Sequence, residues 1–322
     1  MHQLRCLPNQ IAYLAPLGLE DLFAERLAGK PHLRQERLFW GAIEDSLLNR
    51  FASNIWRELY EIEFDSISDC AKALTSLQRS WWAYMPAGSS RASYIQKALP
   101  HVGAKPVVFT GKPMVYPPLG SWRLLDDHRV LASPSCSSPR PNGEWIFAED
   151  RAGPPNRAYL KLWEAFTRIG VAPQKGEICL DLGASPGGWT WVLHQMGAHV
   201  KAFDRSPLRA DLMQAAGVEF IEADAFRVDL SAYPEASWLF CDVICYPEKL
   251  YEWVSTCMVP SSIQYAVCTL KFQGREHYGV IDSFAQIPNG WLGHLSQNKH
   301  ELTWVWSRLP QGGSPTAEAA WG

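Results

Sequence analysis

Four polar residues in the second half of the chain follow apolar runs, and their types could bind a nucleoside and move a proton. Asp181, Asp204 and Asp242 are acids, and Lys271 is a base. In an open α/β sheet the carboxyl ends of parallel strands share one edge, where ligands bind. A carboxylate can accept both hydroxyls of a ribose, and a lysine takes a proton where burial or a nearby cation lowers its pKa. The pattern therefore predicts a ligand site at this edge, with Asp242 and Lys271 close together.

A glycine-rich loop follows Asp181 and indicates a close approach between the backbone and a ligand. It reads Gly183-Ala184-Ser185-Pro186-Gly187-Gly188, and Trp189 begins a helical pattern. Glycine has no Cβ and tolerates φ and ψ values that other residues avoid. The G-x-x-x-G-G spacing, with a proline inside, departs from the G-x-G-x-x-G fingerprint of dinucleotide-binding domains. An NAD-dependent dehydrogenase is therefore disfavoured.

Helical and strand patterns alternate from residue 154 onward. Five short apolar runs read as strands, at 178–182, 200–203, 218–221, 238–241 and 265–270. Helical patterns lie at 158–166, 208–216 and 248–258, and a hairpin is expected from 290–295 and 302–306. This alternation predicts right-handed βαβ crossovers and a doubly wound, mostly parallel α/β sheet over 154–309. Residues 310–322 are predicted to form a loose tail.

The first 133 residues predict a smaller α+β domain. Strands are expected at 10–15, 107–110 and 128–131, and helices at 18–27, 46–61 and 94–99. Residues 134–153 are rich in serine, proline and glycine at their start and predict a linker and lead-in segment, with Trp145–Phe147 packing on the second domain. The stretch Leu14–Glu20 is similar to the opening of THUMP-like RNA-binding domains. An accessory domain that only packs on the second one is the alternative.

Composition limits the partners that this chain could bind. A net charge of −3 and a pI of about 6.3 do not suit non-specific binding of a duplex, so DNA is not expected and RNA binding would need a local patch. The eight cysteines form no C-x-x-C pair, so no metal site is predicted and a reducing, cytoplasmic compartment is expected. No signal peptide or membrane-spanning run is recognisable.

The run Asp181-x-Gly183-x-x-Pro186-Gly187-Gly188 resembles the first motif of S-adenosylmethionine (SAM) methyltransferases, in the form typical of the FtsJ-like RNA ribose 2′-O-methyltransferases. The resemblance implies a Rossmann-like domain with SAM as cofactor. It implies cofactor contacts from Asp181, Gly183, Ala184, Ser185, Pro186, Gly187, Gly188, Trp189, Asp204, Asp224 and Asp242. Asp204 lies 23 residues after Asp181 (181 to 204), near the spacing at which an acid meets a ribose. Asp224 is similar to the acid that accepts the adenine amino group. The alternatives are a helix cap at Asp204 and ordinary turn chemistry at Asp224.

FtsJ-like enzymes use a Lys-Asp-Lys-Glu tetrad, and this sequence has a candidate for each member. The stretch 157–162 resembles the family's first helix, 241–242 and 269–271 resemble its strand ends, and 299–305 resembles its final strand. The resemblance assigns Lys161, Asp242, Lys271 and Glu301. In this hypothesis Lys271 takes the proton of a ribose 2′-hydroxyl, Asp242 and Lys161 orient the groups, and Glu301 supports them. The alternative is an ion-pair network at the sheet surface.

The resemblance spans roughly residues 154–307, and the two-domain layout is similar to bacterial members that methylate large-subunit rRNA. RNA, with rRNA expected, is therefore the predicted partner. Two other readings stay open, namely a SAM methyltransferase with another class of substrate and a non-catalytic RNA-binding relative. The sequence specifies neither the nucleotide nor the oligomeric state.

Overall fold

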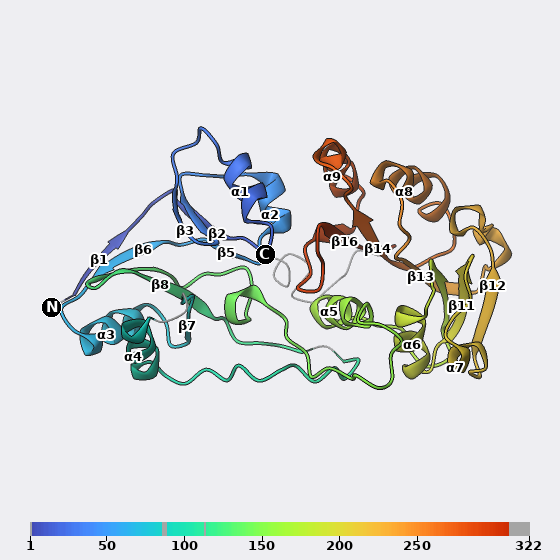
Figure 1. Cartoon of the computed structure of the whole chain (residues 1–322), viewed down its shortest axis with the longest axis horizontal. Coiled ribbons are helices and arrows are strands. Elements are labelled where there is room, and N and C mark those ends of the chain that lie inside the picture. The colour runs from blue at the N-terminus through green and yellow to red at the C-terminus, as the bar shows by residue number, and fades with distance from the viewer. Residues whose placement is uncertain (1, 86–88, 113, 309–322) are drawn as a thin grey trace. The chain divides into compact units, whose positions relative to one another are not determined.

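The computed structural model describes residues 2–85, 89–112 and 114–308, so the predicted tail over 310–322 lies outside the described residues. The contacts between Cα atoms divide the described chain into two compact units (Figure 1). The first unit holds residues up to 106 and 115–146, and the second holds 107–114 and the residues from 147 onward. The described chain thus passes between the units at 106/107, 114/115 and 146/147, and the last of these changes lies within the segment 134–153.

The first unit is α+β and contains two sheets. Its five-stranded sheet has the order β1-β6-β9-β8-β7, and its four-stranded sheet has the order β3-β4-β2-β5. The strands are β1 (Gln3–Cys6), β2 (Ile11–Leu14), β3 (Leu33–Gln35), β4 (Leu38–Gly41), β5 (Asn54–Trp56), β6 (Tyr60–Glu63), β7 (Trp81–Ala83), β8 (Gly120–Asp126) and β9 (Arg129–Ser133). The helices are α1 (Glu20–Arg26), α2 (Ser46–Phe51), α3 (Ile67–Leu77) and α4 (Ser90–Ala98). Whether this unit is a THUMP-like, RNA-binding domain stays a prediction.

Three segments of the first half differ from the sequence-based expectation. The strand predicted over 107–110 is absent, and only Val107 forms an isolated bridge, with Phe147. The helix predicted over 46–61 ends at Phe51, because residues 54–56 pair with β2 and bury all three side chains as a strand. The segment predicted as a linker is partly built into the first unit, where Cys136 forms a bridge with Trp56 and Ser138 is buried. Trp145 packs edge-on against Tyr116 in this unit. The difference over 54–56 arises because a short apolar run is compatible with either a helix or a strand, and the pairing of this run with β2 favours the strand.

The second unit has one seven-stranded sheet in the order β12-β11-β10-β13-β14-β16-β15. The strands are β10 (Ile178–Leu182), β11 (His199–Asp204), β12 (Val218–Glu222), β13 (Ala236–Cys241), β14 (Tyr265–Lys271), β15 (Gly290–Gly293) and β16 (Glu301–Ser307). The first five strands in this order are parallel, and β16 pairs antiparallel with both β14 and β15. The predicted doubly wound, mostly parallel sheet and its terminal hairpin are confirmed.

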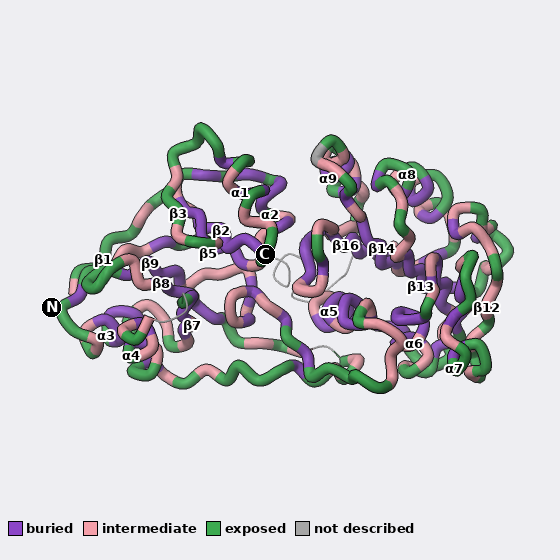
Figure 2. Tube along the Cα trace, in the orientation of Figure 1, coloured by how far each residue is buried: buried purple, intermediate pink, exposed green. Residues whose placement is uncertain are grey.

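The helices of the second unit cover the two faces of this sheet. They are α5 (Tyr159–Ile169), α6 (Gly188–Gln195), α7 (Ala210–Met213), α8 (Pro247–Trp253), which continues as a π-helix over Val254–Met258, and α9 (Gly279–Ala285). Helices α5 and α6 pack together on one side of the strands, and α8 and α9 on the other (Figure 1). The central strands β13 and β14 are buried (Figure 2), as their near-continuous apolar sequences require. In the described part of the chain, no helix is both long and apolar enough to cross a membrane.

The order of the strands reverses at β10 and creates a crevice at the carboxyl edge. Strand β11 lies on one side of β10 and β13 on the other, so the loops after β10 and β13 leave the same edge side by side. The amide of Asp242 donates to the carbonyl of Leu182 over 3.2 Å, which holds the starts of these two loops together. Ligands bind at such a reversal point in open α/β sheets.

Candidate active site

The glycine loop after β10 packs tightly against the protein itself. Gly183 has a φ of +76° and Gly187 a φ of +112°, which L side chains rarely adopt. A Cβ at Gly183 would lie 2.7 Å from Cγ2 of Val243, and one at Gly187 would lie 2.3 Å from Cδ1 of Leu212. The space that these two glycines leave is therefore occupied by protein atoms, so they allow the neighbouring segments to approach and do not only make room for a ligand.

Two residues of the predicted cofactor-binding set lie in the core behind this loop. Asp181 is 1% exposed, and its Oδ2 accepts a hydrogen bond of 2.6 Å from Oγ1 of Thr190. The pKa of Asp181 is raised to about 7, mainly by burial and partly by the charges of Asp242 and Asp204, against the opposing effect of the Thr190 hydroxyl. Trp189 is also buried, and its Nε1 donates to the carbonyl of Ala158 over 2.9 Å. Asp181 and Trp189 therefore support the glycine loop from the core of the second unit.

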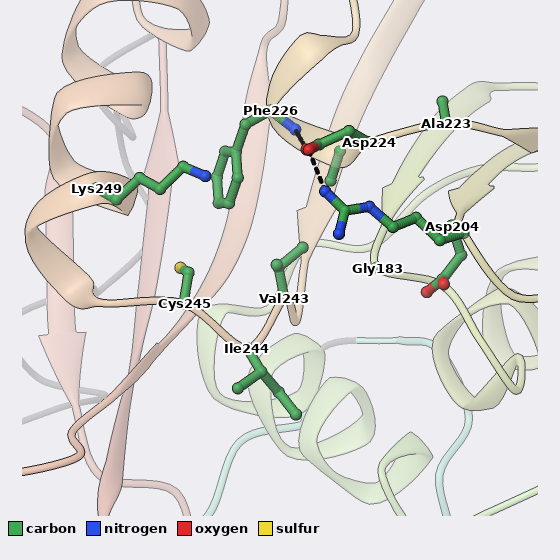
Figure 3. A pocket seen from close by; sticks show the side chains of 11 residues that line it. Gly183, Asp204, Ala223, Asp224, Phe226, Val243, Ile244, Cys245 and Lys249 are labelled. Carbon is green, nitrogen blue, oxygen red and sulfur yellow. Dashed lines mark hydrogen bonds and ion pairs between the residues drawn. The ribbon is translucent and has the colours of Figure 1, made fainter.

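A pocket of about 250 Å³ opens at the carboxyl ends of β10, β11 and β12 (Figure 3). Three predicted cofactor residues line it, namely Gly183, Asp204 and Asp224. The pocket wall also contains Arg205, Ala223, Ala225, Phe226, Val243, Ile244, Cys245 and Lys249, which sequence reasoning missed. All of these residues except Lys249 lie within three residues of Asp204, Asp224 or Asp242, the acids predicted at the ends of strands. This closeness in the sequence is the signal that could have indicated them. The other predicted residues of the loop do not line the pocket.

The two acids in the pocket wall are fixed by backbone amides. Asp204 accepts from the amides of Ser185 and Ser206, over 3.0 and 2.9 Å. Asp224 accepts from the amide of Phe226 over 3.0 Å and forms an ion pair with Arg205 (Figure 3). The Phe226 amide and then Arg205 lower the pKa of Asp224. Because each carboxylate oxygen can accept more than one hydrogen bond, both acids retain acceptor capacity toward the pocket.

An aromatic ring and an ammonium group complete the pocket wall. Nζ of Lys249 lies 4.6 Å from the ring centroid of Phe226. The pocket therefore offers acceptors for hydroxyl and amino groups next to an aromatic surface, and these groups suit a nucleoside.

The four predicted catalytic residues meet at the same edge of the sheet. Nζ of Lys161, on α5, lies 2.5 Å from Oε1 of Glu301 and 3.5 Å from Oδ1 of Asp242. Nζ of Lys271 lies 3.0 Å from the same Oδ1 and donates to the backbone carbonyl of Asp242 over 2.6 Å. Lys271 ends β14 and pairs in register with Glu301 at the start of β16. The structure thus brings together residues that are up to 140 positions apart (161 to 301).

This cluster is largely shielded from solvent. The exposed fractions of the side chains are 11% for Lys161, 12% for Glu301, 18% for Asp242 and 21% for Lys271. Oδ1 of Asp242 is buried and accepts no hydrogen bond of regular geometry, although both ammonium groups lie within 3.5 Å of it. The alternative interpretation, an ion-pair network exposed at the sheet surface, does not describe this cluster, because its side chains are mostly buried. Lys161 is held between two carboxylates, and Lys271 has the more exposed side chain of the two lysines.

A buried ion pair behind the cluster connects the elements that carry Lys161 and Glu301. Glu164, one turn along α5 from Lys161, is fully buried and lies 3.0 Å from Nη1 of Arg168. Its Oε2 accepts from the amide of Ser296 over 2.8 Å, in the connection that leads from β15 to β16. Burial raises the pKa of Glu164 to about 7, against the opposing effect of Arg168. Sequence reasoning missed this pair, for which the signal was an acid and a base four residues apart on a mostly apolar helix.

The model of the FtsJ-like methyltransferase family matches residues 154–273. This segment contains three of the four clustered residues, and Glu301 lies beyond it.

Among the described residues, no group of three or more His, Cys, Asp or Glu side chains is arranged to hold a metal ion.

Curated relatives include ribosomal RNA large subunit methyltransferases M of several bacteria. The protein of Halorhodospira halophila is 38% identical over 152 residues, which cover 46% of this chain and 44% of that one. The protein of Xanthomonas oryzae pv. oryzae is 32% identical over 201 residues, which cover 59% of this chain and 52% of that one. The chain thus spans about half the length of the curated relatives that it matches. Among solved structures, a candidate hemolysin of Streptococcus thermophilus has a TM-score of 0.41 and 21% identity, over 55% of this chain and 75% of that chain.

Proposed function

We propose that this chain, whose residues 154–273 match the FtsJ-like methyltransferase family, transfers a methyl group from SAM to a ribose 2′-hydroxyl of rRNA. The observation that carries the proposal is the cluster of Lys161, Asp242, Lys271 and Glu301 beside a nucleoside-sized pocket. The names of the relatives, which are rRNA methyltransferases, support rRNA as the substrate. A cytoplasmic site of action belongs to the same proposal.

The residues of the pocket suit SAM. Asp204 would accept the hydroxyls of its ribose, and Asp224 would accept its adenine amino group. Phe226 offers an apolar surface for the adenine, and the backbone of Gly183 borders the same space. When bound, SAM supplies an electrophilic methyl group on a sulfonium, whose sulfur leaves as a neutral thioether, so the leaving group needs no acid.

The cluster would handle the proton of the acceptor. A ribose hydroxyl is a poor nucleophile until a base takes its proton as its oxygen attacks the methyl carbon. Lys271, acting as the neutral amine, would take that proton on Nζ. The ammonium that results lies 3.0 Å from Oδ1 of Asp242, which stabilises the new charge. Because the hydroxyl must also lie in line with the bond that breaks, the cluster contributes by orientation as well as by proton transfer.

Lys271 suits the role of base better than Lys161 does. Lys161 is less exposed, and its ammonium is contacted by both Glu301 and Asp242. These contacts fix Lys161 as an orienting cation and leave Lys271 as the amine that an incoming hydroxyl can reach. Glu301 would hold Lys161 in place, and Asp242 would position both lysines.

The test is transfer of radiolabelled methyl from SAM to rRNA by the Lys271→Ala variant. We expect the rate to fall by roughly 10²- to 10⁴-fold, the usual contribution of a general base, while SAM still binds. Lys201→Ala is the matched control, because it removes a lysine of the same unit that pairs with the exposed Glu219. Full activity of Lys271→Ala would refute the assignment. Binding of SAM by the wild-type protein without any transfer to RNA would favour a non-catalytic relative.

A further inference from the structure

Aromatic side chains follow two of the clustered residues in the chain. Tyr246 lies four residues after Asp242, and His277 lies six residues after Lys271. Both segments leave the carboxyl ends of neighbouring parallel strands, β13 and β14. The rings of Tyr246 and His277 meet with their centroids 5.1 Å apart. The topology therefore places a ring pair beside the edge at which the methyl acceptor is expected.

The loop that begins at Asp242 exposes an unusual amount of apolar surface. Ile244 is 79% exposed and Tyr246 is 55% exposed. Within the part of the second unit that the structure describes, the exposed large hydrophobic residues are Val108, Met213, Ile244 and Tyr246. Two of these four thus share one short loop, which forms part of the pocket wall and leads into α8. Single exposed apolar residues are ordinary, whereas a pair next to a reaction centre indicates a ligand-facing surface.

The His277 ring packs against Tyr246, and Pro247 restricts the backbone of Tyr246. Nδ1 of His277 lies 2.9 Å from Oε1 of Glu248, which fixes the imidazole that backs the tyrosine. Tyr246 is also the N-cap residue of α8, and Pro247 follows it at the first helical position. A residue before proline has a restricted backbone, which limits the directions that the Cα–Cβ bond of Tyr246 can take.

A second group of rings borders the cluster on the side of Glu301. The hydroxyl of Tyr278 and Nε2 of His300 are hydrogen-bonded, and His300 directly precedes Glu301. The ring of Phe272, next to Lys271, lies 5.2 Å from that of Tyr278. These rings are at least partly buried, so Tyr246 presents the most open aromatic face of this border.

We propose that Tyr246 is a stacking platform for a nucleobase of single-stranded RNA, beside the ribose that Lys271 deprotonates. This inference rests on the proposed function. Unpaired bases in RNA are recognised mainly by stacking on aromatic side chains. The chain carries a net charge of −3, so contacts with phosphates alone would hold RNA weakly, and a supported aromatic face supplies affinity that does not depend on charge. A base also fits the geometry of the loop, because Ile244 extends the apolar surface toward the pocket of the methyl donor.

The test measures binding of a fluorescein-labelled, single-stranded oligoribonucleotide of mixed sequence to the full chain by anisotropy. Loss of one base stack corresponds to a roughly 5- to 150-fold weaker Kd, and we expect a change in this range for Tyr246→Ala. Tyr246→Phe retains the ring and should bind within roughly twofold of the wild type. Met213→Ala removes an exposed large side chain of the second unit, 42% exposed, from α7 and outside the pocket wall, and should leave the Kd unchanged. The dependence of log Kd on log salt should be the same in all variants, because no phosphate contact is lost.

Two results would overturn the platform. One is a wild-type protein that does not bind the oligoribonucleotide, and the other is a Tyr246→Ala variant that binds it as the wild type does. The methyl-transfer assay on rRNA separates this inference from the proposed function. If binding of the oligoribonucleotide depends on Tyr246 but the wild-type protein transfers no methyl group to rRNA, the stacking role of Tyr246 is supported and the proposed function is refuted. If Tyr246→Ala transfers the methyl group with an unchanged KM for rRNA, the proposed function is supported and the stacking role of Tyr246 is refuted.

Discussion

Replacing Asp181 with asparagine should change how the stability of the protein depends on pH. Asp181 is 1% exposed and accepts from Oγ1 of Thr190 over 2.6 Å. Burial is the main reason that its pKa rises from an ordinary value of 3.8 to about 7. Asparagine has almost the same shape and keeps an oxygen that can accept from Thr190, but it has no charge to bury.

The direction and the size of the effect follow from proton linkage. Between about pH 4 and pH 7 the folded state holds a proton on Asp181 that the unfolded chain releases, so this group lowers stability as pH rises through that window. A shift of about three pKa units corresponds to about 4 kcal/mol at most, since each unit is worth about 1.4 kcal/mol. Asp181→Asn should therefore match the wild type near about pH 4 and exceed its stability by roughly 2–4 kcal/mol at about pH 8.

Denaturant titrations of the full chain at a series of pH values measure this difference directly. Titrating groups that do not interact with Asp181, including Glu164, are common to both proteins and cancel in the comparison. Asp229→Asn is the control, because Asp229 is a solvent-exposed cap whose pKa is lowered by Ser231, and its replacement should give no gain at high pH. A difference between wild type and Asp181→Asn that stays constant across the pH range would refute the reasoning, as would a variant that is less stable throughout.

Two further predictions concern the support of the cluster and the donor pocket. At about pH 8, where Glu164 is ionised, Glu164→Gln removes the carboxylate that neutralises the buried Arg168 and should cost about 3–5 kcal/mol in the free energy of unfolding. Methyl transfer should fall as well, because glutamine has one acceptor oxygen where Glu164 uses two, one for Arg168 and one for the amide of Ser296 in the segment before Glu301. Glu219→Gln, which breaks an exposed pair, should cost less than about 1 kcal/mol in the same titration, and equal costs would contradict the account. Asp204→Asn should weaken SAM binding roughly 10- to 100-fold by calorimetry, since it removes a charged acceptor from the pocket. Asp229→Asn should leave that Kd unchanged, and an unaltered Kd in Asp204→Asn would exclude the proposed ribose contact.

The sequence predicted the parallel sheet and the residues at its carboxyl edge because both depend on short-range patterns. The strand predicted over 178–182 is β10 without change, and Asp242 and Lys271 lie at neighbouring strand ends as expected. Lys161 and Glu301 were assigned by resemblance, and the register of β14 with β16 and the start of α5 bring them into the cluster.

Other features depend on packing that no local pattern specifies. A strand pattern shows where Asp181 ends an apolar run but not that its side chain points into the core toward Thr190. Gly183 lines the pocket as the prediction for this loop requires, but no local pattern shows that Val243 also packs against it. The pair of Glu164 with Arg168 has the spacing of a solvent-exposed helix pair, and only the docking of the β15–β16 connection shows that it is buried.

The most direct test of the central claim is the position of the methyl group on the product. rRNA would be incubated with the protein and SAM carrying a labelled methyl group, hydrolysed in alkali and analysed by mass spectrometry. A ribose 2′-O-methyl group blocks alkaline cleavage at its nucleotide, so the account predicts the label in an alkali-resistant dinucleotide and its loss in Lys271→Ala. Label on a base, or on the ribose at an undiminished rate in Lys271→Ala, would contradict the account.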